Sequence, residues 1–95
     1  MTLKFKARVW VYSGMGGWHF VTLPPAQTKK VREAVPLRKG FGSVRVHARI
    51  GKTEWQTSIF PDKRSQSYVL PIKAAVRKAE SIANDKSVQV ELRLA

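Results

Sequence analysis

The side chains whose chemistry stands out in this sequence are basic. Eighteen Lys and Arg residues stand against six Asp and Glu residues, a net charge of +12. Residues 1–51 hold ten of the bases and one acid, Glu33. A field of this sign attracts polyanions, but it also serves as a solvated surface that keeps a protein soluble. Phosphate contacts with nucleic acid and incidental surface charge are therefore both open, ahead of an anionic membrane or an acidic partner.

Catalytic chemistry is poorly represented. The two histidines, His19 and His47, lie 28 residues apart and show no metal-ligand spacing with a carboxylate. There is no Ser-His-Asp set, no paired acid and no nucleophile elbow. Cysteine is absent from the sequence, which excludes disulfides and cysteine-bound metal. We expect a protein that is not an enzyme and that has no metal and no cofactor.

The elements that must position the basic side chains follow from hydrophobic alternation. In the first strand Leu3, Phe5, Ala7, Val9 and Val11 point inward and Lys4, Lys6, Arg8 and Trp10 outward. Six strands are predicted, at 3–11, 18–23, 43–50, 53–60, 67–70 and 87–94. Two helices are predicted, one over 26–35 and one from Pro71 to Asn84-Asp85, where asparagine suits a left-handed cap.

The glycine-rich stretch Gly14-Met15-Gly16-Gly17 joins two predicted strands. Phosphate-binding loops run from a strand into a helix, so we expect a flexible hairpin loop here in preference to a ligand loop. No apolar run is long enough for a membrane-spanning helix. The 95 residues are expected to form a single domain without a membrane partner, in a reducing, cytoplasmic compartment, and as a monomer rather than an obligate oligomer.

An internal repeat connects these elements. The stretch 43–50 matches 87–94 at a spacing of 44 residues, and Leu23-Pro24 matches Leu70-Pro71 at a spacing of 47. The chain thus reads strand–strand–helix–strand twice, with repeat one at about 3–50 and repeat two at about 53–94. We predict a mainly β fold, a six-stranded pseudo-symmetric barrel flanked by two short helices, because closure protects the strand edges.

Several motifs in order along residues 3–94 resemble a known prokaryotic family, domain of unknown function nineteen-oh-five. They are Trp18-His19-Phe20-Val21-Thr22-Leu23-Pro24, Gly42-Ser43-Val44-Arg45-Val46, Trp55-Gln56-Thr57-Ser58, and Leu70-Pro71 followed by Val76-Arg77-Lys78-Ala79. More distantly, the last segment resembles the swapped-hairpin DNA-binding family of AbrB, MazE and MraZ type. The resemblance implies a double-split β-barrel formed by one chain, and no assigned activity. Asn84 stands where the family usually has glycine.

The candidate nucleic-acid contacts come from three places. If the first and third predicted strands are neighbours, their outward cations form one patch, made of Lys4, Lys6, Arg8, Arg45 and Arg49. The first helix and the connection after it supply Lys29, Lys30, Arg32, Arg38 and Lys39. On the second helix, Arg77 either contacts nucleic acid or is structural, capping a carbonyl or pairing with Asp85 or Glu80.

The aromatic residues also allow two interpretations. Trp10 and Tyr12 continue the outer face of the first strand, where they either stack on bases or are partly buried. Trp18, Phe20, Trp55 and Tyr68 are expected to fill the core or its ends. The leading hypothesis is a non-catalytic module that binds DNA or RNA phosphates. The alternative is a small-molecule-binding or accessory interaction domain, favoured by an apolar pocket among Trp18, Trp55 and Tyr68.

Overall fold

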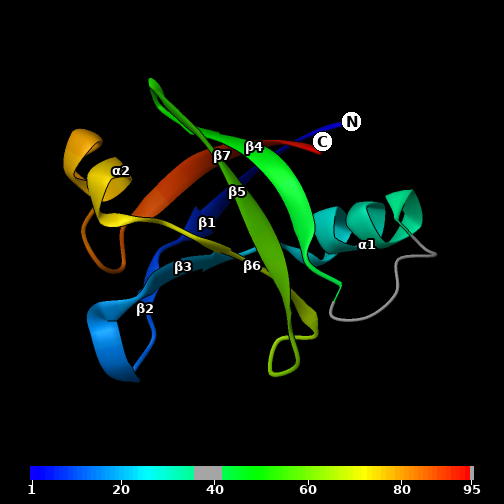
Figure 1. Cartoon of the computed structure of the whole chain (residues 1–95), viewed down its shortest axis with the longest axis horizontal. Helices are drawn as coiled ribbons and strands as arrows, with labels where there is room; N and C mark the ends of the chain where they lie inside the picture. The colour runs from blue at the N-terminus through cyan, green and yellow to red at the C-terminus, as the bar shows by residue number, and fades with distance from the viewer. Residues whose placement is uncertain (36–41, 95) are drawn as a thin grey trace.

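The computed structural model describes residues 1–35 and 42–94. In this part of the chain seven antiparallel strands form one curled sheet in the order β1-β7-β4-β5-β6-β3-β2. Two short helices lie at opposite ends of the long axis of the molecule (Figure 1). The elements are β1 (Thr2–Arg8), β2 (Trp10–Val11), β3 (His19–Thr22), α1 (Pro25–Ala34), β4 (Val44–Ile50), β5 (Thr53–Asp62), β6 (Ser67–Pro71), α2 (Ala74–Ala79) and β7 (Ser87–Leu94).

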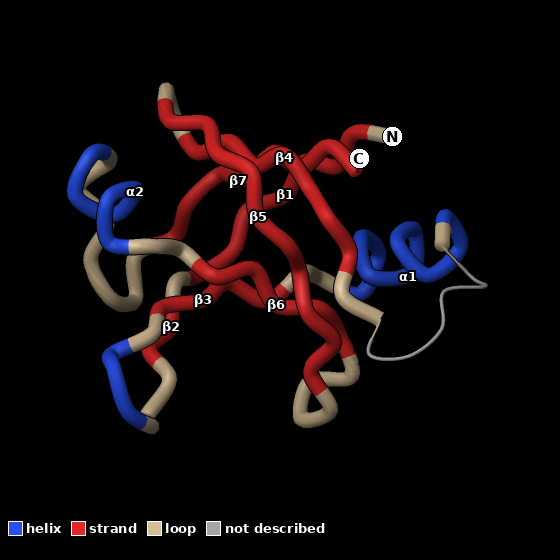
Figure 2. The backbone as a smooth tube through the Cα atoms, in the orientation of Figure 1, coloured by secondary structure: helices blue, strands red, loops and turns tan. Residues whose placement is uncertain are grey.

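The core is built from the inward rows of the sheet, as the alternation predicts. β4 and β7 lie side by side in the sheet, and their apolar residues at every second position are buried, except Leu94, which is partly buried, while the residues between them are not buried. Because the sheet curls on itself (Figure 2), these rows face one another across a single interior. The buried residues of the two strands are Val44, Val46, Ala48, Ile50, Val88, Val90 and Leu92.

The first predicted strand is interrupted at Val9. Before it β1 pairs with β7, and after it β2 pairs with β3 at the other end of the sheet order. The Val9 amide donates to the Lys86 carbonyl (2.9 Å), and the Val9 carbonyl accepts from the Asp85 amide (2.8 Å), so the backbone at the break keeps its hydrogen bonds. Two shorter strands therefore replace the single strand predicted over 3–11.

The interruption also reverses one predicted orientation. Val9 is fully buried, but the side chain two residues later, at Val11, is 37% exposed and does not point into the core as predicted. β2 is only two residues long and forms the last strand in the sheet order, so its end at Val11 projects beyond the packed interior. Alternation holds only while a strand keeps its partner.

β5 changes partners in the same manner. Its residues 53–59 pair with β4, and its last three residues, Phe60 to Asp62, pair with β6. Ile59 is fully buried at this change. The strand runs two residues beyond the predicted end at Phe60, through Pro61, which lies opposite Tyr68 in the register. Proline has no N–H to donate, and a position where the ladder changes partner tolerates it.

The helices differ in how well their sequence signals predict them. α1 lies within one residue of the predicted 26–35 at each end and begins directly after Pro24. α2 has only six residues, because Ser81 takes a left-handed φ of 54° and the Ile82 amide donates to the Arg77 carbonyl (2.9 Å). This closing turn draws Ile82 into the core. The predicted end at Asn84-Asp85 is therefore wrong, and Asp85 rather than Asn84 has a left-handed φ.

The two valines on either side of Trp10 allow a matched test of the interruption. Replacing Val9 by Ala should lower the free energy of unfolding by about 2 kcal/mol, because two buried methyl groups are removed from a packed site. The same replacement at Val11 should change it by less than about 0.5 kcal/mol. Urea denaturation followed by circular dichroism measures both. Equal losses for the two variants would contradict the described break.

Candidate functional site

A cleft of about 360 Å³ opens between the β2–β3 loop, β5 and the segment leading into α2. Its volume lies at the lower end of the range that small-molecule sites occupy. Four of its apolar lining residues are Trp18, Trp55, Pro71 and Ile72, and its polar side chains are His19, Gln56, Thr57, Lys73 and Arg77. None of the lining side chains in the described part of the chain is acidic.

The β2–β3 loop positions the exposed wall of the cleft. Gly16 and Gly17 have φ values of 86° and 60°, a backbone region that favours glycine, and they form a tight turn directly before Trp18. A Cβ atom on Gly16 would lie 3.1 Å from the Trp18 ring, so the glycine also makes room for the indole. Residues 14–17, predicted to form a flexible hairpin loop, therefore support the Trp18 side chain.

Trp18 is exposed rather than buried. Its side chain is 57% exposed, which corrects the prediction that it fills the core, whereas Trp55 is 8% exposed. The Trp18 ring stacks on Phe20, with ring centroids 6.1 Å apart and planes 15° apart, and Trp10 packs against the same Phe20 at 5.1 Å. An aromatic ring held by such stacking offers a rigid apolar surface to a ligand.

A chain of hydrogen bonds holds Arg77 at the cleft. His19 Nδ1 lies 2.7 Å from the Gly17 carbonyl, and because a carbonyl only accepts, Nδ1 carries the proton. His19 Nε2 then presents its lone pair to Arg77 Nη1 in a long contact of 3.5 Å, and Arg77 Nε donates to the Ile72 carbonyl at 3.2 Å. These contacts orient the guanidinium and leave three of its five N–H groups for other partners.

This geometry can be compared with what the sequence predicts for Arg77 and Tyr68. Among the interactions expected of Arg77, the carbonyl contact is present, whereas its pairing with Asp85 or Glu80 is not found among the described residues. Tyr68, expected beside the two tryptophans, is buried elsewhere and does not line the cleft. Lys73 and His19 belong to the cleft although sequence reasoning did not select them. The break of the alternation at Gly16-Gly17, directly before Trp18 and His19, is the signal that could have indicated them.

The predicted patch on the first and third strands does not form as expected. β7 lies between β1 and β4, so the cations of the two strands are not neighbours. The Glu91 carboxylate of β7 stands between them, 3.6 Å from Lys4 Nζ and 3.0 Å from Arg49 Nη2. Lys4, Glu91, Arg49 and Glu54 form one row of alternating charge across the register. This row neutralises two of the five cations.

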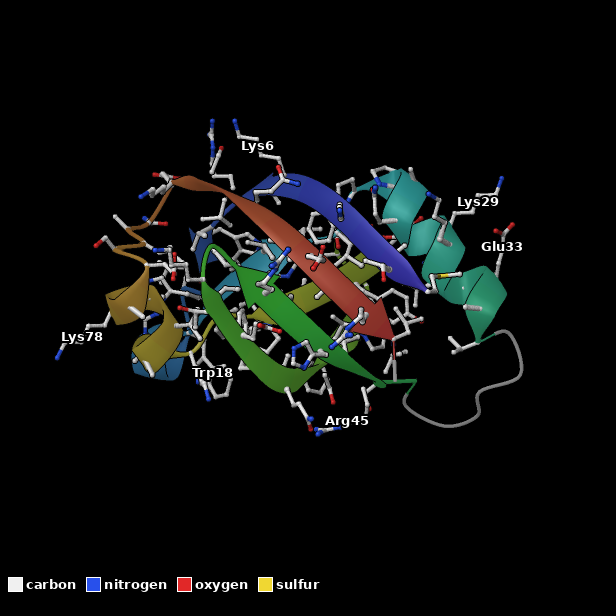
Figure 3. The ribbon with its side chains drawn as sticks, turned by 90° about the horizontal axis from the view of Figure 1, so that it is seen from above. Lys6, Trp18, Lys29, Glu33, Arg45 and Lys78 are labelled. Atoms are coloured by element: carbon white, nitrogen blue, oxygen red, sulfur yellow. The ribbon has the colours of Figure 1, made fainter. Side chains whose placement is uncertain are left out.

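The remaining predicted cations do not gather into one patch. Lys6, Arg8 and Arg45 are exposed at the ends of the same sheet face, and Lys29 and Lys30 are exposed on α1. Arg32 donates to the Gln66 carbonyl at 2.7 Å, which gives it a structural partner. Arg38 and Lys39 lie outside the described residues. Figure 3 shows Lys6, Lys29, Arg45 and Lys78 projecting from different sides of the molecule.

His47 has a specific partner on the outer sheet face. His47 Nε2 lies 2.7 Å from a Glu54 carboxylate oxygen, across the β4–β5 pair. This hydrogen bond is the main cause that lowers the pKa of the Glu54 carboxyl from its ordinary 4.5, and the charges of Arg49 and Arg93 act in the same direction. His47 therefore has a carboxylate as its nearest charged partner.

The sheet and the cleft define a class of protein: a small, basic, mainly β domain with a ligand-sized cleft beside its last strands. A family model described as a domain of unknown function (DUF1905) matches residues 5–92. The chain belongs to this family. Among curated proteins, none matches the chain. The more distant resemblance to the AbrB, MazE and MraZ type stays a prediction.

Two further features are absent from the described residues. In residues 1–35 and 42–94 no helix is long and apolar enough to cross a membrane. Over the same ranges no three His, Cys, Asp or Glu side chains lie close enough together to hold a metal ion.

The lowered pKa of Glu54 predicts an acid-dependent contribution to stability. A carboxyl whose pKa is lower in the folded state stabilises the fold above its unfolded pKa and loses that contribution as the pH falls through the folded value. The variant Glu54→Gln should therefore be less stable than the wild type at about pH 6, and this difference should narrow as the pH falls toward about 3. Thermal unfolding across this range measures it.

Glu33→Gln is the matched control, because Glu33 is exposed on α1 and makes no ion pair among the described residues. Its melting temperature should stay close to that of the wild type throughout. A difference between Glu54→Gln and wild type that is the same at both ends of the pH range would contradict the assigned pairing.

Proposed function

We propose that this chain is a non-catalytic binding module that contacts nucleic-acid phosphates through its exposed Lys and Arg side chains. The observation that supports it best is that most of the few acidic side chains already have partners within the protein. Four of the six acidic side chains bond to neighbouring groups: Glu54, Asp62, Glu80 and Glu91. Most of the basic side chains, in contrast, have no ion pair within the described ranges. The positive excess is thus available to a polyanion.

The arrangement of these cations favours phosphate contacts over base reading. Exposed cations without an ion pair in the described residues occur on β1, β4 and α1, and they project in several directions (Figure 3). Sequence-specific readout places one element in a groove with several side chains against base edges. Dispersed charge instead attracts the backbone regardless of sequence and makes binding steeply dependent on salt.

We also propose that the architecture is a six-stranded pseudo-symmetric double-split barrel, with residues 2–11 counted as one bent strand. The registers support this proposal. The first strands of the two halves differ by 52 residues, so Leu3 corresponds to Trp55, and the last strands differ by 44, so Leu92 corresponds to Ala48. Leu3 pairs with Leu92, and Trp55 pairs with Ala48 in the same way. With a shift of 47 for the short strands, Trp10–Phe20 likewise corresponds to Asp62–Ser67. Two equivalent half-chains would share one core.

The cleft favours a second proposal, that the chain binds a small molecule. Apolar walls with a few polar groups directed to one place are typical of ligand sites. Trp18 and Trp55 line the cleft as the sequence-based alternative expected, and Lys73 and Arg77 lie at the same place. The two proposals use different surfaces, since none of the β1, β4 or α1 cations lines this cleft.

The nucleic-acid proposal is tested by fluorescence anisotropy with labelled single-stranded and duplex oligonucleotides at two ionic strengths. We expect dissociation constants of roughly 10⁻⁶ to 10⁻⁴ M, and these constants should rise steeply with the salt concentration. The double variant Lys6→Ala and Arg8→Ala removes two exposed cations of β1 that have no ion pair in the described residues. For duplex DNA it should reduce the slope of log K against log salt by about 1.8.

The charge-matched control is the double variant Lys4→Ala and Arg49→Ala. It removes the same net charge, but both of its cations are already paired with Glu91. Its slope should change less than that of the β1 variant. The absence of any anisotropy change at low salt and tens of micromolar protein would refute the proposal, and equal slopes for the two variants would refute the role of the unpaired cations.

A further inference from the structure

We infer that the cleft binds a small molecule in which a planar aromatic ring is linked to a phosphate monoester, as in a nucleoside monophosphate. This inference rests on the second proposal, that the cleft is a small-molecule site, and it is independent of phosphate binding by the outer cations. Three features of the cleft lead to this ligand class: its aromatic wall, its positive charge without an acid, and the orientation of its arginine.

The aromatic wall accounts for the ring of the ligand. An isolated tryptophan exposed by more than half of its surface loses the stabilisation that burial would provide. Trp18 is nevertheless held in place, by stacking on Phe20 and by the two glycines before it. Figure 3 shows the side chain projecting from the ribbon. A rigid exposed indole beside a cleft suits stacking against a planar ring, which is the common mode of base binding.

The charge of the cleft accounts for the phosphate. Lys73 and Arg77 both line it, and no carboxylate does so within the described residues. On the outer sheet face, by contrast, Glu91 is ion-paired with both Lys4 and Arg49. A phosphate monoester has a charge between −1.5 and −2 at neutral pH, which two cations match. A carboxylate ligand, with a charge of −1, would offset only one of the two positive charges.

The orientation of Arg77 provides directional recognition. Its Nε and one Nη1 hydrogen are directed at Ile72 and His19, so the guanidinium plane is set before a ligand arrives. The remaining N–H groups can donate to phosphate oxygens as a fork, which a lysine in the same place could not reproduce. A group that is already oriented loses less conformational entropy on binding. The cleft volume has room for one such ligand.

The test is a titration of tryptophan fluorescence, with thermal shift as a second readout, using adenosine monophosphate as the probe. Adenosine and inorganic phosphate are the control ligands. We expect adenosine monophosphate to quench the fluorescence and raise the melting temperature, and each control to bind at least about tenfold more weakly, because each lacks one of the two groups recognised. No response up to about 5 mM would overturn the inference, as would equal binding of adenosine and the monophosphate.

Three variants assign the binding to the cleft. Trp18→Ala and Arg77→Ala should each weaken binding about tenfold or more. Because Arg77 also bonds to the backbone, its replacement removes a structural contact as well. Lys73 is exposed, and its side chain makes no hydrogen bond or ion pair among the described residues, so Lys73→Ala provides the same test without that complication. Arg45→Ala, on the outer face of β4, is the matched control and should bind like the wild type. Equal binding by all four variants would overturn the assignment.

Two further arms identify the source of the ligand. If the monophosphate binds and a short oligonucleotide with a 5′-phosphate competes with it, whereas the same oligonucleotide without that phosphate does not, the cleft takes a strand end. If neither oligonucleotide competes, the ligand is a free nucleotide. Either result supports the inference. Because outer-face binding is measured separately with the β1 variant, failure of the cleft and failure of the nucleic-acid proposal are distinguishable.

Discussion

Two long stretches of this chain exchange one strand partner for another beside a fully buried residue, and the sheet depends on these exchanges. In residues 2–11 the exchange occurs at Val9, and in β5 it follows Ile59. Burying such a side chain contributes about 1.5–3 kcal/mol, which exceeds the net contribution of about 1 kcal/mol from a ladder hydrogen bond. At Val9 even that bond is replaced, by contacts with the loop before β7. Core burial therefore determines where each strand bends.

The bends also bring together the segments that line the cleft. Because the chain leaves β7 after β1 and pairs with β3 as β2, the β2–β3 loop carries Trp18 to the side of the sheet where α2 begins. The Ile72 amide donates to the His19 carbonyl at 2.8 Å and fixes the two segments to each other. The result is a place where aromatic and basic side chains meet without a carboxylate in the described residues, whereas Glu91 and Glu54 offset cations on the outer sheet face.

Sequence reasoning succeeds where one strand keeps one set of neighbours. The alternation of Val44 to Ile50 and of Val88 to Leu92 predicts the buried rows correctly, because both strands have a strand partner on each side. It fails at Val11 and Trp18, beyond the break and the glycine turn, where apolar type no longer implies burial. The cationic patch fails for a different reason: alternation gives the face of a side chain but not the order of the strands.

The sequence alone was sufficient for the local properties of the protein: the mainly β class, the positions of most elements, the basic excess and the family. These follow from periodicity, proline and glycine placement and composition, all of which act between near neighbours in the chain. The insertion of β7 between β1 and β4, the exposure of Trp18 and the meeting of His19 with Arg77 depend on contacts between distant segments. They emerge only when the whole chain packs, because a single core has to satisfy every strand at once.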